Sequence, residues 1–129
     1  MLKRAWLALG VLGLALVGVA QAQQATIKRT ILQRSDVPGS TYEVVLGLAE
    51  LPAAVLIGKH THPGTEQGTV VEGELTIMVE GQPEAVFKAG QSWTIAAGTP
   101  HDAKAGSGGA KVIAVYTVEK GKPLASPAN

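Results

Sequence analysis

The sequence predicts an all-β fold, an antiparallel barrel or sandwich. After residue 22, turn-forming residues recur at intervals of about ten residues, the spacing expected of short strands joined by tight turns. No stretch of this region shows the apolar period of a helix. The chain has 129 residues, and its sixteen glycines suit the many turns of such a fold.

The first two predicted strands span residues 25–32 and 42–49. The first is rich in β-forming residues, and the second alternates its side chains in the way of a half-buried strand. A turn cluster at residues 35–40 separates them. Pro52 then interrupts the pattern, and residues 55–61 are expected to continue as a third strand.

The second half of the chain predicts more short strands. Gly73 lies between two apolar runs that we expect to form a tight antiparallel pair, and a glycine-rich stretch, expected to be flexible, precedes the last strong strand. The expected strands are 69–72, 75–79, 85–88, 92–95 and 111–118, with turns at 80–83 and 106–109.

Residues 1–22 predict a secretory signal peptide. Lys3 and Arg4 precede an apolar run over 5–20, which ends in the small-residue cleavage pattern Ala-Gln-Ala. The run is short for a membrane span, which needs about 20 residues. An uncleaved membrane anchor is the alternative, and the absence of cysteine excludes a lipoprotein. We therefore expect a periplasmic or secreted protein with no stable membrane association after cleavage.

The mature chain is expected to begin at Gln23 and to fold as one domain over residues 23–118, followed by a flexible C-terminal tail over 119–129. Removing Lys3 and Arg4 from the eleven basic residues leaves nine against ten acidic ones, a net charge of −1. No basic patch indicates a nucleic-acid partner. Without cysteine there is neither a disulfide nor a thiolate site.

The three histidines and one carboxylate predict a metal site. His60 and His62 lie two apart in a predicted strand and so point to the same face. Glu66 follows a Pro-Gly turn and can return to that face, while His101 follows a Gly-Thr-Pro turn at the start of another strand. We expect His60, His62, Glu66 and His101 to bind a divalent transition metal, with positions left for exchangeable ligands.

At these residues the sequence resembles the cupin family. The first family motif places two histidines, a glutamate and a glycine at the spacing of His60, His62, Glu66 and Gly73, and the second fits Gly90, Gly98 and His101. Three family positions differ, because a glycine, a proline and an asparagine are replaced here by Ala54, Ala96 and Ala105. The resemblance covers roughly residues 54–105.

The resemblance implies a cupin-type antiparallel β-barrel, a jelly roll, which holds Mn, Fe, Ni or Zn and assembles as a homodimer. It also implies dioxygenase, isomerase, decarboxylase or lyase chemistry on a small oxygenated or carbonyl compound. A non-catalytic module that binds a metal or small ligand is the alternative, and a purely structural barrel is a third. Fold alone does not decide among them.

Few other side chains stand out as pocket groups. Trp93 can face the cavity, although a core or interface position is the more common one for tryptophan. Asp102 adjoins His101 and is expected on the opposite, surface side of its strand. The roles of Lys59 and Glu72 stay open, and no general acid or base is assigned. The remaining aromatic side chains of the mature chain are Tyr42, Phe87 and Tyr116.

Overall fold

The computed structural model describes residues 26–129, and the predicted signal peptide lies outside them. This part of the chain forms one antiparallel sheet and no helix, so it contains no helix that could span a membrane. The all-β antiparallel fold class is confirmed. The strands are β1 (Lys28–Asp36), β2 (Tyr42–Leu51), β3 (His60–Thr61), β4 (Thr65–Val79), β5 (Ala85–Lys88), β6 (Ser92–Ile95), β7 (His101–Glu119) and β8 (Ser126–Pro127).

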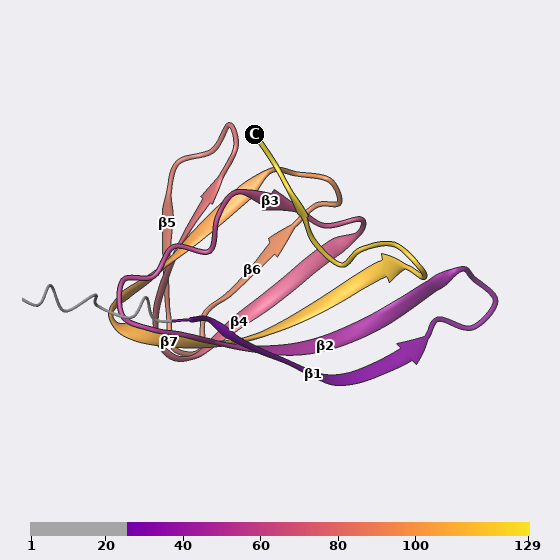
Figure 1. The fold of residues 1–129 in the computed structure, drawn as a ribbon, viewed down its shortest axis with the longest axis horizontal. Coiled ribbons are helices and arrows are strands. Elements are labelled where there is room, and N and C mark those ends of the chain that lie inside the picture. The colour runs from indigo at the N-terminus through magenta and orange to yellow at the C-terminus, as the bar shows by residue number, and fades with distance from the viewer. Residues whose placement is uncertain (1–25) are drawn as a thin grey trace, which may run out of the picture.

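The two longest strands, β4 and β7, hold the sheet together. They pair with each other along most of their length, while β4 also pairs with β5 and β6. The second half of β7 pairs with β2, which pairs in turn with the edge strand β1, and the first residue of β7 pairs with β3. Figure 1 shows the sheet curling over, so that β3 and β6 lie above β4 and β2.

The tight pair predicted around Gly73 is wrong. Residues 69–72 and 75–79 belong to one continuous strand, β4, whose register with β7 shifts on either side of Gly73. Gly73 has a φ of 77°, and a Cβ there would lie 2.2 Å from the carbonyl oxygen of Gly109 on β7. The glycine therefore serves a bulge that bends the strand where another backbone approaches closely.

Two other predicted boundaries also differ. The glycine-rich stretch 106–109 lies inside β7, so the predicted last strand, 111–118, is only the second half of that strand. Of the predicted strand 55–61, only His60–Thr61 has strand pairing, apart from a single bridge between Leu56 and Lys104.

The core lies inside the curl of the sheet. Every second side chain along parts of β4 and β7 points inward, and β6 adds two more, as expected for strands with one buried face. Each valine, leucine or isoleucine side chain among them stabilises the fold by about 1.5–3 kcal/mol when fully buried. The buried cluster consists of Leu51, Val70, Leu75, Ile77, Trp93, Ile95, Ala103, Ala105, Ala110 and Val112.

The C-terminal segment after β7 crosses back to β3. β8 pairs with β3, and the Ala128 amide donates a hydrogen bond to the Lys59 carbonyl at 3.0 Å. The Lys59 ammonium donates to the backbone oxygen of Asn129 at 2.7 Å. The flexibility expected over 119–129 stays a prediction, but the segment lies against β3, which contains the predicted ligand His60 and directly precedes His62.

Candidate metal centre

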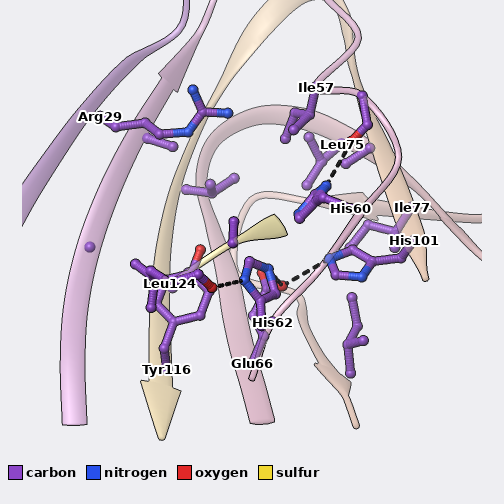
Figure 2. A pocket seen from close by; sticks show the side chains of 18 of the residues that line it. Arg29, Ile57, His60, His62, Glu66, Leu75, Ile77, His101, Tyr116 and Leu124 are labelled. Atoms are coloured by element: carbon purple, nitrogen blue, oxygen red, sulfur yellow. Dashed lines mark hydrogen bonds and ion pairs between the residues drawn. The ribbon is translucent and has the colours of Figure 1, made fainter. Parts of the chain in front are cut away.

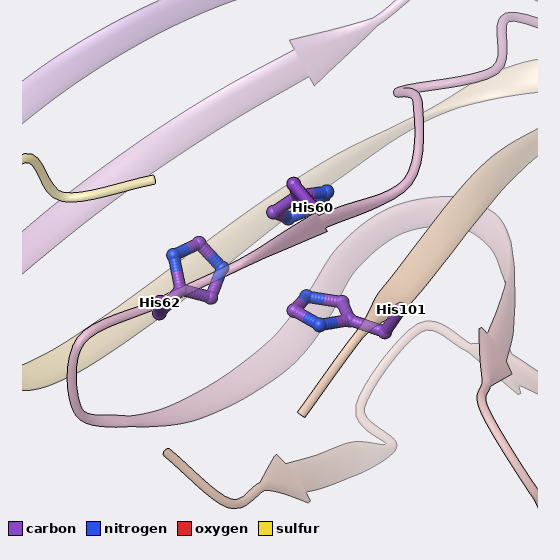
Figure 3. Close-up of side chains that lie close together, drawn as sticks. All are labelled: His60, His62 and His101. Carbon is purple, nitrogen blue, oxygen red and sulfur yellow. The ribbon is translucent and has the colours of Figure 1, made fainter. Parts of the chain in front are cut away.

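The fold brings the three histidines together. His60 lies in β3 and is the direct cross-strand partner of His101, the first residue of β7. His62 follows β3 and precedes the Pro-Gly turn, after which β4 begins at Thr65. One ring nitrogen from each histidine lies within 4.8 Å of the others, and Figure 3 shows the three rings converging. The three histidines could therefore hold a metal ion, as their spacing predicted.

Backbone carbonyls orient all three imidazoles in the same way. A carbonyl oxygen only accepts hydrogen bonds, so each Nδ1 must carry the proton and each neutral ring presents the lone pair of Nε2. That tautomer is the one that a metal-binding histidine with a hydrogen-bonded second nitrogen adopts. The Nδ1 atoms donate to Gly58 at 2.7 Å from His60, to Leu124 at 2.7 Å from His62 and to Thr99 at 2.9 Å from His101.

Glu66 brings a carboxylate to the same point. Its Oε2 lies 3.0 Å from Nε2 of His62 and 3.2 Å from Nε2 of His101, and the glutamate is only 7% exposed. The His62 Nε2 and the Glu66 Oε2 have no hydrogen-bond donor, because with Nδ1 protonated both are acceptors. Two buried acceptors this close need a cation between them, either a proton or a metal ion. The donor set therefore fits a divalent transition metal. Glu66 as its fourth ligand stays a prediction.

Burial and the neighbouring side chains shift the pKa values of Glu66, His101 and His60. Burial raises the pKa of the Glu66 carboxyl, but in the metal-free site His101 and His62, when a proton on Nε2 lets them donate to it, outweigh burial and hold the pKa at about 2. Burial lowers the pKa of His101, yet the bond to Glu66 raises it overall. Burial also lowers the pKa of His60, and the neighbouring histidines lower it further. At neutral pH the site thus offers an ionised carboxylate and an uncharged His60.

Trp93 holds the Glu66 carboxylate in place through a hydrogen bond. Its indole Nε1 donates a hydrogen bond to Oε1 of Glu66 at 3.3 Å. The ring lies directly over Gly68, where a Cβ would be 2.1 Å from Cζ2 of Trp93, so only glycine fits there. Both readings of Trp93 hold, because it belongs to the buried core and also lines the cavity.

Asp102 has a structural role that its surface assignment did not include. Its Oδ1 accepts a hydrogen bond from the amide of Gly58 at 2.9 Å, which fixes the segment leading into His60. The two side chains whose roles the sequence left open both form ion pairs: Lys59 with Glu80 at 2.7 Å, and Glu72 with Lys111 at 3.1 Å.

The histidines open into a cavity of about 420 Å³. Its walls are mostly apolar, and Figure 2 shows Ile57, Leu75 and Ile77 beside the cluster. Ser126 and the rest of 124–127 also line it, so the C-terminal segment forms part of the wall. This volume lies near the small end of the range for small-molecule pockets, about 300–1,000 Å³.

Two polar wall residues had no assigned role in the sequence. Tyr116 is the cross-strand partner of Glu66, and its ring centroid lies 4.7 Å from that of His62. Burial raises the pKa of the Tyr116 phenol and the charge of Glu66 raises it further, so the hydroxyl stays protonated at neutral pH. Arg29 of β1 lies at the cavity wall. No local pattern marks Arg29, because only the pairing of β1 with β2 brings it there.

Comparison with known proteins identifies the family. The model of the Cupin domain matches residues 47–116, more than half of the chain. The chain belongs to the cupin family. A comparison with curated proteins finds no match.

Solved structures share the fold of this cupin. A cupin superfamily protein from Desulfitobacterium hafniense has a TM-score of 0.63 at 17% identity, over 77% of this chain and 84% of the other. A DMSP lyase from Ruegeria pomeroyi has a TM-score of 0.62 at 18% identity, over 66% and 43%. An oxalate oxidase in complex with the substrate analogue glycolate has a TM-score of 0.57 at 23% identity, over 64% and 45%. The chain thus spans less than half the length of these two enzymes.

One departure of this cupin from the family motif has a visible backbone consequence. Ala54, at the position where the motif has glycine, has a φ of 57°, the only positive φ of a non-glycine residue in the part of the chain that the structure describes. This left-handed conformation costs an alanine about 1–2 kcal/mol. Ala105, at the asparagine position of the motif, is buried in the core.

Proposed function

We propose that this cupin is a metal-dependent enzyme that acts on a small oxygenated or carbonyl compound in the cavity beside the histidines. The observation that carries the proposal is the convergence of three imidazole Nε2 lone pairs and the Glu66 carboxylate at the buried end of an apolar cavity. We further propose that His60, His62, Glu66 and His101 are the metal ligands and that the ion is Mn, Fe, Zn or Ni. Such an ion, when bound, supplies Lewis-acid polarisation of a ligand oxygen, or oxygen activation if it is iron.

The side chains around the proposed metal site would orient the Glu66 carboxylate and a bound ligand in an apolar cavity. Apolar walls offer water few hydrogen-bonding partners, and a ligand that displaces the remaining water would strengthen every electrostatic interaction inside. Trp93 holds one oxygen of Glu66, which leaves the other directed at the histidines. The protonated hydroxyl of Tyr116 is available to donate a hydrogen bond to a ligand oxygen that becomes more negative during reaction.

The similar structures agree with an enzyme without choosing its reaction. The DMSP lyase and the oxalate oxidase have the same fold but little sequence identity, so dioxygenase, isomerase, decarboxylase and lyase activity all stay within the proposal. A module that binds a metal or small ligand without turnover is the alternative. Turnover measured on the metal-loaded protein separates the two.

The test is elemental analysis of the protein purified without chelator, beside a His60→Ala/His101→Ala variant. We expect about one equivalent of a single metal in the protein and none in the variant, because the variant keeps only one imidazole. Circular dichroism must show that the variant is folded. No metal in the protein, and no uptake when Mn, Fe, Zn and Ni are added in turn, would refute the proposal.

We also propose that the protein is exported, with residues 1–22 removed, and that it forms a homodimer. The basic, apolar and small-residue order of the first 22 residues supports export. The exposed Ile31 and Leu32 on the edge strand β1 support a dimer. N-terminal sequencing of the periplasmic protein, and light scattering during size-exclusion chromatography, test these two proposals.

A further inference from the structure

The cavity wall has a cation that no acidic side chain neutralises. Two basic residues line the cavity, Lys59 and Arg29. Lys59 is paired with Glu80 at 2.7 Å. Within residues 26–129, Arg29 has no ion pair.

The other basic residues of β1 show that this is a local property of Arg29. Lys28 pairs with Glu50 at 3.2 Å and Arg34 with Glu43 at 2.7 Å, each across to β2. The cross-strand partner of Arg29 is Ala49, which has no charge to offer. Ala49 and the nearby Gly47 are both small and also line the cavity. The β2 side of the cavity therefore leaves space in front of the guanidinium instead of a carboxylate.

Arg29 lies on the opposite side of the cavity from the metal centre. Figure 2 shows its guanidinium extending from β1 toward the cavity, with His60 and His101 on the far side. Tyr116 lies beside His62, with their ring centroids 4.7 Å apart, and also lines the cavity (Figure 2). The cavity lining also includes many apolar side chains, Ala114 and Val112 among them.

We propose that the ligand of this cavity is a small carboxylate whose anionic group binds Arg29, while an oxygen at its other end faces the histidine cluster. A guanidinium presents paired N–H donors that match the two oxygens of a carboxylate, and the exposed position of Arg29 lets its partner arrive from solvent. Arg29 is then a specificity-determining residue. It selects ligands whose negative group reaches across the cavity from the oxygen that faces the histidines. The proposal rests on the proposed function only for the contact at the histidines, since binding of the carboxylate to Arg29 does not depend on the ion.

The experiment compares matched acids on the zinc-loaded full chain. Glutarate and pentanoate have the same five-carbon chain, but pentanoate has a methyl group in place of the second carboxylate. We expect glutarate to bind about tenfold more tightly than pentanoate. This is a smaller gain in affinity than a fully buried charge-assisted pair would give, because Arg29 is exposed. We expect the single carboxylate of pentanoate to bind at the zinc, so Arg29→Gln should remove the preference for glutarate and leave pentanoate binding unchanged. Two-dimensional NMR titration measures both affinities and shows that each variant is folded.

Lys28→Gln is the matched control, because it removes the same charge from the next residue on the same strand. The preference for the diacid should survive in this variant. Equal losses in Lys28→Gln and Arg29→Gln would show a general charge effect and overturn the proposal. Arg29→Lys should recover only part of the preference, since lysine keeps the charge and loses the paired donors.

The length of the probe and the state of the metal are both varied. Succinate and adipate are titrated beside butyrate and hexanoate, and the absence of any Arg29-dependent preference at all three lengths overturns the proposal. Metal content is measured on the same samples, and the titrations are repeated after chelator treatment. A protein that takes up no metal on loading but still shows the Arg29-dependent preference would refute the metal proposal and support this one. No dependence on Arg29 in either form would sink this one alone.

Discussion

Removing the last six residues should weaken metal binding without unfolding the barrel. The segment pairs with the backbone of β3, and it also contacts an imidazole of the cluster directly through the 2.7 Å hydrogen bond from Nδ1 of His62 to the carbonyl of Leu124. Losing the partner of a buried donor costs about 1–3 kcal/mol. Because water can reach Nδ1 once the segment is gone, we take the low end, which corresponds to roughly a five- to tenfold weaker metal affinity. This is near the low end of the effect of groups that orient metal ligands, about 10–100-fold.

The assay is competition for zinc between a chromophoric chelator and the protein ending at Pro123. Leu124→Ala in the full chain is the control, because it removes the side chain and keeps the carbonyl that His62 uses. We expect near-normal affinity in this control. The reasoning is refuted if the shortened chain, folded by circular dichroism, binds zinc as tightly as the full chain. It is also refuted if Leu124→Ala loses as much affinity as the truncation.

Three further predictions concern stability. Ala54→Gly should raise the free energy of unfolding by up to about 1 kcal/mol in urea titration, since relief of the left-handed strain exceeds the added freedom of the unfolded chain; a lower value would contradict the strain. Gly68→Ala should lower it by about 1–3 kcal/mol, because the new Cβ displaces Trp93, and unchanged Trp93 fluorescence with unchanged stability would count against this packing. The free energy of unfolding of chelator-treated protein should fall by roughly 3 kcal/mol or less as the pH falls from about 4.5 toward 2. The reason is that the depressed pKa of Glu66 stabilises the fold only while the carboxyl is ionised. In Glu66→Gln, the free energy of unfolding should change less over the same pH range.

The ligand histidines were accessible from the sequence because their placement depends on local geometry. The two-residue spacing of His60 and His62 fixes their common face, and the turn before Glu66 returns the chain to it. Arg29 and the Leu124 carbonyl escaped prediction because they reach the site only through strand register and a long return of the chain. Gly73 misled the analysis because a glycine between two apolar runs indicates a hairpin and a bulge equally well.

The position of Leu124 also sets an order of events during synthesis. A ribosome makes the chain from its N-terminus, so His60, His62 and Glu66 emerge well before His101, and the Leu124 carbonyl that orients His62 emerges later still. An ion that arrives early would meet a ligand set still lacking one imidazole and the group that aligns another. The proposed metal centre is therefore complete only after both the start of β7 and Leu124 have been made.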